Sequence, residues 1–125
     1  MIEFEGVSYE HLGGVRALDG VSLKIETGES VAIVGENGAG KTTLVKHIVG
    51  LLKPSSGKVL VDGQDTQKTS TARLARNVGI AFQNPDHQLF SESVEEEITF
   101  ALRNFGFATD VVESRVVWAL RTFGL

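Results

Sequence analysis

Three stretches in the first third of the chain have the hydrophobic pattern of β-strands. Residues 2–9 alternate apolar and polar side chains with one slip at Gly6, which predicts a half-buried strand with a bulge. Residues 21–25 alternate without interruption and predict a second strand of this kind. Residues 30–34 combine β-branched and small apolar side chains with no polar alternate, so we expect a strand buried on both faces.

The pattern changes after residue 40. Residues 42–49 carry apolar side chains at helical spacing and are followed by Gly50, which predicts a helix that ends there. Residues 58–61 and 78–82 have strand patterns, and the dipeptide Asp62-Gly63 after the first of them is a tight-turn signal. Between them, residues 71–76 are expected to form a short helix.

The last third of the chain predicts two helices. Ser93 followed three residues later by Glu96 is a capping-box pattern, and acidic residues in the first turn suit the helix dipole. Asp110 with Glu113 repeats a cap-like start for the second helix, which Gly124 ends. Twelve of the 14 glycines precede residue 80, so turns should gather in the first part and helix should dominate the last.

Composition narrows the class of protein. The 125 residues are 42% hydrophobic and 22% charged, as in globular domains, and contain no cysteine for a disulfide framework or a thiolate metal site. A net charge of −4 provides no basic footprint for non-specific nucleic-acid binding. No apolar run approaches the roughly 20 residues of a membrane-spanning helix, and the N-terminus is acidic where a secretory signal would be basic. We expect a soluble cytoplasmic chain with no membrane span of its own and no nucleic-acid partner.

The clearest chemical signal is a glycine-rich loop between the apolar segment 30–34 and the helix predicted at 42–49. The loop matches G-x-x-x-x-G-K-[ST] with the residues Gly35, Glu36, Asn37, Gly38, Ala39, Gly40, Lys41 and Thr42. Backbone N–H groups of such a loop hold phosphate oxygens, and the following helix adds its positive dipole end. Lys41 supplies charge for the β- and γ-phosphates, Thr42 offers a hydroxyl to Mg²⁺, and Thr43 can reach another phosphate. A plain glycine-rich turn is the alternative, and the flanking strand and helix patterns disfavour it.

Other positions carry weaker signals. Tyr9 can stack on a base, although most strand aromatics are simply core residues. Gln83 ends an apolar strand pattern and opens a loop, where ligand groups often lie, but an ordinary polar loop residue is the simpler interpretation. His11, His47 and His87 lack the spacing of metal ligands, so we expect surface histidines.

Together these motifs resemble the nucleotide-binding subunit of ABC transporters over essentially all 125 residues. Beyond the phosphate loop, the matching segments are 4–9, 17–23, 27–35 and 54–59. The resemblance implies that Tyr9 contacts the adenine of ATP. It also places Gln83 at the glutamine that contacts Mg²⁺ and the attacking-water region and signals to the membrane subunit. Lys41 and Gln83 are then the expected catalytic contacts, and Thr42 and Gln83 the expected metal contacts.

A narrower resemblance rests on residues 82–90 and 94–98. These segments are similar to the ATPase of energy-coupling-factor transporters, which import vitamins or transition metals. The implied partners are a transmembrane subunit that docks near the Gln83 loop and a second ATPase subunit, identical or different. The implied location is the cytoplasmic face of the cell membrane.

The sequence departs from the family in one large respect. It contains no LSGGQ-type signature, no Walker B strand ending in Asp-Glu, no D-loop and no switch histidine. The resemblance therefore implies an α/β P-loop NTPase fold of the ABC ATPase type with an N-terminal antiparallel β portion and an incomplete RecA-like core. Residues 1–90 would hold the β-subdomain and phosphate-loop core, and 91–125 the start of a helical subdomain. We expect a fragment that binds nucleotide and does not hydrolyse it alone, with apolar surface exposed where the sheet is incomplete.

Two other functions stay open at this point. A different P-loop protein, such as a small kinase or GTPase, shares the phosphate loop, but no N/TKxD-type guanine-reading motif is present. A non-catalytic nucleotide-binding or regulatory module is the other alternative, because half of the catalytic motifs are missing.

Overall fold

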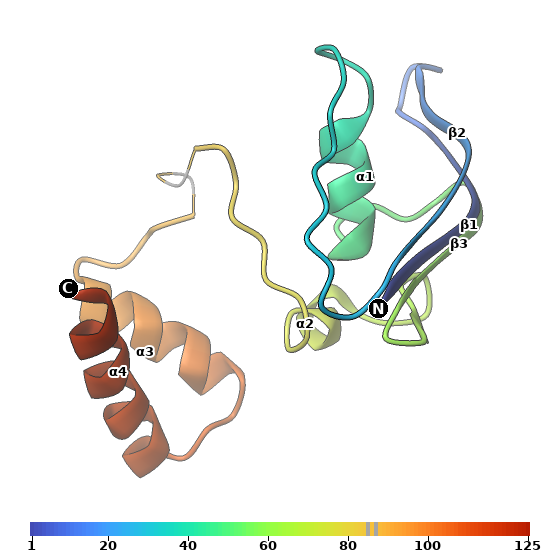
Figure 1. The fold of residues 1–125 in the computed structure, drawn as a ribbon. Helices are drawn as coiled ribbons and strands as arrows, with labels where there is room; N and C mark the ends of the chain where they lie inside the picture. The colour runs from blue at the N-terminus through green and yellow to red at the C-terminus, as the bar shows by residue number, and fades with distance from the viewer. Residues whose placement is uncertain (85, 87) are drawn as a thin grey trace. The chain divides into compact units, whose positions relative to one another are not determined.

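The computed structural model describes residues 1–84, 86 and 88–125 (Figure 1). The chain forms two units, Met1–Ile80 and Ala81–Leu125, and each is described by itself. His87 lies outside the described residues, so the expectation of a surface histidine there is not addressed. In the described part of the chain, no helix is long and apolar enough to cross a membrane.

The first unit is built on an antiparallel sheet with the strand order β2-β1-β3-β4. Its strands are β1 (Ile2–Glu10), β2 (Arg16–Ile25), β3 (Ser56–Val61) and β4 (Gln64–Asp65). The register shifts between Phe4 and Val7, and Gly6 lies in this shift at φ +58°, so the predicted bulge is confirmed. The Gly6 N–H donates to Ser22 Oγ on β2 at 2.9 Å, which keeps the bulge hydrogen-bonded.

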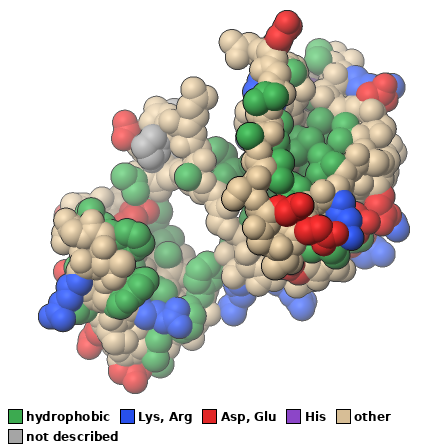
Figure 2. All heavy atoms as spheres, viewed as in Figure 1, with side chains coloured by type: hydrophobic (Ala, Val, Ile, Leu, Met, Phe, Trp, Pro, Cys, Tyr) green, Lys and Arg blue, Asp and Glu red, His purple; other side chains and the backbone are tan. Residues whose placement is uncertain are grey.

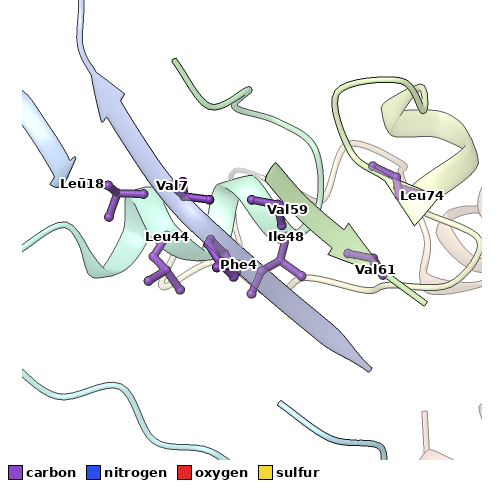
Figure 3. Close-up of a cluster of buried hydrophobic side chains, with 8 residues drawn as sticks. All are labelled: Phe4, Val7, Leu18, Leu44, Ile48, Val59, Val61 and Leu74. Atoms are coloured by element: carbon purple, nitrogen blue, oxygen red, sulfur yellow. The ribbon is translucent and has the colours of Figure 1, made fainter. Parts of the chain in front are cut away.

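The core of this unit lies between the sheet and α1 (Lys41–Ile48) (Figure 3). Strand side chains and helix side chains point toward one another there, since Leu44 and Ile48 are one turn apart on the face of α1 that meets the sheet. The short helix α2 (Thr71–Leu74), capped by Ser70, contributes a fully buried side chain. The buried cluster comprises Phe4, Val7, Leu18, Leu44, Ile48, Val59, Val61 and Leu74.

The second unit contains two helices, α3 (Val94–Asn104) and α4 (Thr109–Phe123). The cap predicted at Ser93 is confirmed, because its Oγ accepts a hydrogen bond from the Glu96 N–H at 3.1 Å. The cap-like start predicted at Asp110 is wrong. The N-cap is Ala108, which makes no side-chain cap, and Asp110 lies in the first turn, where its charge suits the helix dipole.

Two predicted strands are absent from the described structure. Residues 30–34 and 78–82 join no sheet ladder, and Val34 is 87% exposed. An extended segment becomes a strand by sharing ladder hydrogen bonds with a neighbour, and the described residues provide none for these segments. A cavity of about 320 Å³, lined mainly by apolar side chains, lies between residues 33–34 and β2. Figure 2 shows apolar side chains on the surface of this unit, and Val31, Ile33 and Val34 are among the exposed ones.

Candidate phosphate-binding site

The phosphate loop lies directly on β2. Gly38 and Gly40 both have φ +85°, a left-handed conformation that glycine adopts without steric cost. A Cβ atom on Gly40 would lie 2.4 Å from the backbone oxygen of Ala17 and 3.4 Å from Leu18 Cδ2. The glycine at position 40 is therefore required both by its conformation and by the close approach of the loop to the strand.

Gly40 is also the N-cap of α1, where no side chain accepts a hydrogen bond from the first turn. The first N–H groups of a helix have no intrahelical acceptor, and they lie at the positive end of the helix dipole. In α1 these groups come directly after the glycine-rich loop. The Leu44 N–H donates to the Gly40 oxygen at 2.8 Å and begins the helical ladder. This arrangement provides a set of donors for an anion.

The Lys41 side chain folds back over the loop. Its Nζ donates to the backbone oxygens of Gly35 at 2.8 Å and Glu36 at 2.7 Å. The ammonium is thus held by two carbonyl oxygens at the loop's start, and Thr42 beside it is exposed. Because phosphate oxygens accept hydrogen bonds as carbonyl oxygens do, this geometry suits a positive charge that exchanges carbonyl partners for phosphate.

Tyr9 on β1 contacts two histidine rings, those of His11 and of His47, and His47 lies on α1. The half-buried Tyr9 ring lies edge-on to His11, with centroids 5.0 Å apart, and to His47, with centroids 4.8 Å apart. His11 Nε2 lies 3.4 Å from Thr43 Oγ1, and His47 Nδ1 lies 2.7 Å from the Thr43 backbone oxygen. The structure therefore brings Tyr9 and Thr43 together through two histidines.

The expectation that the histidines lie on the surface is wrong for His47, which is fully buried. Leu44, His47 and Ile48 share the buried face of α1, and that i, i+3, i+4 spacing was the sequence signal for it. Burial lowers the pKa of His47 below its ordinary value of 6.5. His11 is exposed as expected, and its contact with Thr43 had no signal in the sequence.

Gln83 belongs to the second unit, where it lies outside the helices with an exposed side chain. Its predicted contacts with nucleotide and Mg²⁺ stay a prediction. In the same unit, the N–H groups of Phe90 and Ser91 donate to Glu97 Oε2 at 3.3 and 2.9 Å. Hydrogen bonds from Ser91 lower the pKa of the Glu97 carboxyl. The same hydrogen bonds connect the loop before α3 to that helix.

Comparison with known proteins agrees with this geometry. The sequence model of the family described as ABC transporter matches residues 18–125. The energy-coupling factor transporter ATP-binding protein EcfA of Methanothermobacter thermautotrophicus is 46% identical over 127 aligned positions, which cover 100% of this chain and 41% of that protein.

Two solved structures share the fold along the chain. CbiO1 of Clostridium perfringens, part of the ABC transporter complex CbiONQ, has a TM-score of 0.83 and 38% identity, covering 99% of this chain and 50% of that one. A dimeric ATP-binding cassette in a post-hydrolysis state bound to ADP and Pi has a TM-score of 0.81 and 26% identity, covering 100% of this chain and 58% of that one. The chain thus spans about half the length of these relatives. With its phosphate loop on β2 and the family match from residue 18 onward, this chain belongs to the ABC transporter family and has the P-loop α/β fold of its ATPase domains.

Proposed function

We propose that this chain is the N-terminal part of one ABC-type ATPase domain and that it binds ATP with Mg²⁺. The observation that carries the proposal is the loop from Gly35 to Lys41, pressed on β2 at Gly40 and followed by an uncapped helix N-terminus. Such a loop can surround a phosphate group with N–H donors and one ammonium. In this proposal residues 1–90 form the β-subdomain and phosphate-loop core, and 91–125 begin the helical subdomain.

Each candidate residue has a role that fits its position. Loop N–H groups from residue 35 to residue 43 would bind the phosphates, and Lys41 would leave its two carbonyl partners to contact the β- and γ-phosphates. The exposed Thr42 hydroxyl is a hard oxygen ligand suited to Mg²⁺, whose chemistry is to bridge and neutralise phosphate oxygens. Tyr9 would contact the adenine, and Gln83 would approach the metal and the attacking water.

Hydrolysis belongs, in this proposal, to the intact protein. Phosphoryl transfer depends on positioned charge, and these 125 residues contain no Walker B carboxylate, signature motif or switch histidine. We therefore propose that the 125 residues alone bind nucleotide without turnover. Measurable ATP hydrolysis by the isolated chain would contradict this part of the proposal and exclude a purely non-catalytic role.

The proposed transporter class is the energy-coupling-factor type, with a vitamin or a transition-metal ion as its cargo. EcfA supports this class, since it is described as an energy-coupling factor transporter ATP-binding protein, and CbiO1 is part of an ABC transporter complex. The partners would be a transmembrane subunit near the Gln83 loop and a second ATPase subunit, for which the CbiONQ complex and the dimeric cassette are precedents. This assembly would hold the chain on the cytoplasmic face of the cell membrane.

Substitution of Lys41 tests nucleotide binding. In the intact protein, Lys41→Ala should abolish measurable Mg-ATP binding in calorimetry, because the loop loses its ammonium group. Lys68→Ala is the matched control, since Lys68 is 85% exposed on the same unit and should leave affinity unchanged. An unchanged Mg-ATP affinity in Lys41→Ala would refute the proposed function.

A further inference from the structure

We propose that the dipeptide Asn37-Gly38 in the phosphate loop is a site of spontaneous chemical modification, from which bound nucleotide protects the protein. In the nucleotide-free loop, the backbone nitrogen of Gly38 displaces ammonia from the Asn37 side chain. The protection rests on the proposed function, namely that this loop binds ATP. The reaction itself depends only on the two residues and their surroundings, so the two parts can be tested separately.

The reaction takes place at the side-chain carbonyl carbon of Asn37. The Gly38 nitrogen bonds to Cγ, the bond from Cγ to Nδ2 breaks, and the amide NH₂ leaves as ammonia with the proton of the Gly38 N–H. The product is a succinimide ring. Water then opens this ring, either at Cγ to leave aspartate or at the backbone carbonyl of residue 37 to leave isoaspartate. In isoaspartate the main chain passes through the side chain and is longer by a methylene group.

Both reacting groups are available in the folded chain. Asn37 and Gly38 are exposed and form the centre of a turn, in which the Ala39 N–H donates to the Glu36 oxygen at 3.2 Å. Among the described residues, none bonds to the Asn37 side-chain amide or accepts from the Gly38 N–H. Gly38 has φ +85°, and a Cβ atom there would meet nothing within 4 Å. The nucleophilic nitrogen therefore has neither a competing acceptor nor a side chain that crowds it.

The other asparagines are useful for comparison, since Asn37 is the only one in the chain that a glycine follows. Asn77 is followed by Val78, whose N–H donates to a carbonyl oxygen of α2 at 3.0 Å. Asn104 is followed by Phe105, whose N–H donates to a carbonyl oxygen of α3 at 3.2 Å. In both pairs the nitrogen must break a hydrogen bond and pass a bulky side chain before it can attack. We therefore expect Asn37 to react fastest of the three.

Bound nucleotide engages the nucleophile. Loop N–H groups are the proposed donors to the phosphates, and a Gly38 N–H that donates to a phosphate oxygen is not free to attack Cγ. The reaction then proceeds only from the nucleotide-free fraction of the protein, and its rate should be proportional to that fraction. At a nucleotide concentration of about 100 times Kd, the rate should fall about a hundredfold.

The modified loop should bind nucleotide poorly. Isoaspartate lengthens the main chain inside the motif and so displaces the N–H groups that follow it. It also places a carboxylate in a loop that is proposed to hold phosphate, where like charges repel. We expect the isoaspartate form to bind Mg-ATP at least about tenfold more weakly than the unmodified protein. The loop thus inactivates itself in protein that stays without nucleotide.

Peptide mapping measures the reaction. The intact protein is incubated at mildly alkaline pH, with and without Mg²⁺ and the β,γ-imido analogue of ATP, which is not hydrolysed. Trypsin releases residues 25–41 as one peptide in which Asn37 is the only side-chain amide, so the mass gain from NH₂ to OH reports this site alone. Asn77 and Asn104 serve as internal controls. Conversion should be fastest at Asn37, and its half-suppression should occur at the Kd that calorimetry gives for the analogue.

Two variants complete the experiment. Lys41→Ala should not bind the analogue, so its Asn37 should convert equally fast with and without it. Asn37→Gln should show no conversion, because glutamine would have to close a larger ring, and it should keep its own starting affinity for Mg-ATP throughout the incubation. Protection by the analogue in Lys41→Ala would mark an effect of added salt and contradict the proposed protection.

Three other results would overturn the inference. One is conversion of Asn37 that is no faster than that of Asn77 and Asn104. The second is undiminished conversion in wild-type protein that calorimetry shows to be saturated with the analogue. The third is full Mg-ATP affinity in the purified isoaspartate form. If instead the wild-type protein bound no nucleotide, the proposed function would fail and the protection with it, whereas conversion of Asn37 in nucleotide-free protein is measured independently.

Discussion

Replacing Gly40 by alanine probes the contact that places the phosphate loop on the sheet. The added methyl would lie 2.4 Å from the backbone oxygen of Ala17, closer than any real Cβ contact. Since that oxygen belongs to β2 and Gly40 caps α1, the clash is relieved only if the helix and the strand move apart. Leu44 would then lose packing against the buried cluster.

Gly38 is the control that separates the steric clash of an added Cβ from the strain of a left-handed backbone. Gly38 has the same φ of +85°, but a Cβ atom there would meet nothing within 4 Å. Gly38→Ala should therefore cost only the left-handed strain of about 1–2 kcal/mol. Gly40→Ala carries the same strain and adds the overpacking cost of about 1–3 kcal/mol, for a total of about 2–5 kcal/mol.

Urea denaturation of the two variants, monitored by circular dichroism, measures the difference in unfolding free energy. Calorimetry with Mg-ATP adds a second readout, in which Gly40→Ala should lose binding more severely because the helix N-terminus moves with the loop. Equal destabilisation by Gly38→Ala and Gly40→Ala would refute this reasoning, since the close approach of Gly40 to Ala17 would then add nothing to the unfolding free energy.

Three further predictions follow from single contacts. Ser93→Ala removes the hydrogen bond to the Glu96 N–H and should lower the unfolding free energy by about 1 kcal/mol in urea denaturation, whereas Ser114→Ala, on an exposed hydroxyl, should be neutral. Phe4→Ala, at a side chain 2% exposed, should cost about 3–5 kcal/mol in the same assay, and a loss below 1 kcal/mol would contradict the assigned core. Because burial lowers the pKa of His47, the unfolded chain takes up a proton below pH 6.5 that the folded chain refuses. The unfolding free energy should therefore fall as pH drops through 6.5, by at most about 1.4 kcal/mol per pH unit, and a wild-type slope retained in His47→Asn would exclude this origin.

The features that the sequence predicted correctly are encoded by residues close together in the chain. The bulge at Gly6 follows from a slip in alternation plus a glycine at positive φ, and the cap at Ser93 follows from spacing to Glu96. The helix that begins at Lys41 after the glycine-rich loop was likewise predicted from a local motif, whereas phosphate binding by the loop stays a prediction. Each of the three leaves a signal in neighbouring residues, although Gly6 also contacts Ser22 and Gly40 also lies against Ala17, both distant in the chain.

The features that could not be predicted from the sequence depend on residues far apart in the chain. The apolar pattern at residues 30–34 predicts a buried strand. A strand forms only beside a hydrogen-bonded neighbour, and the described residues supply none for this segment. The contact of His11 with Thr43 joins positions 32 apart and becomes visible only once α1 lies on the sheet. His47 is an intermediate case, because its helical spacing with Leu44 was visible in the sequence, whereas the surface position was expected from the lack of metal-ligand spacing among the histidines.

The phosphate loop is positioned by its contacts with β2 and by hydrogen bonds within the loop, not by a strand in the segment that precedes it. The segment that leads into the loop, residues 30–34, joins no ladder in the described structure. The loop nevertheless has a defined course, because Gly40 lies against Ala17 and Lys41 bonds to the carbonyls of residues 35 and 36. Tyr9, the proposed base contact, belongs to the same antiparallel sheet through β1. The groups proposed to bind base and phosphate therefore share one framework of β1, β2 and α1, which does not depend on a strand at the exposed segment 30–34.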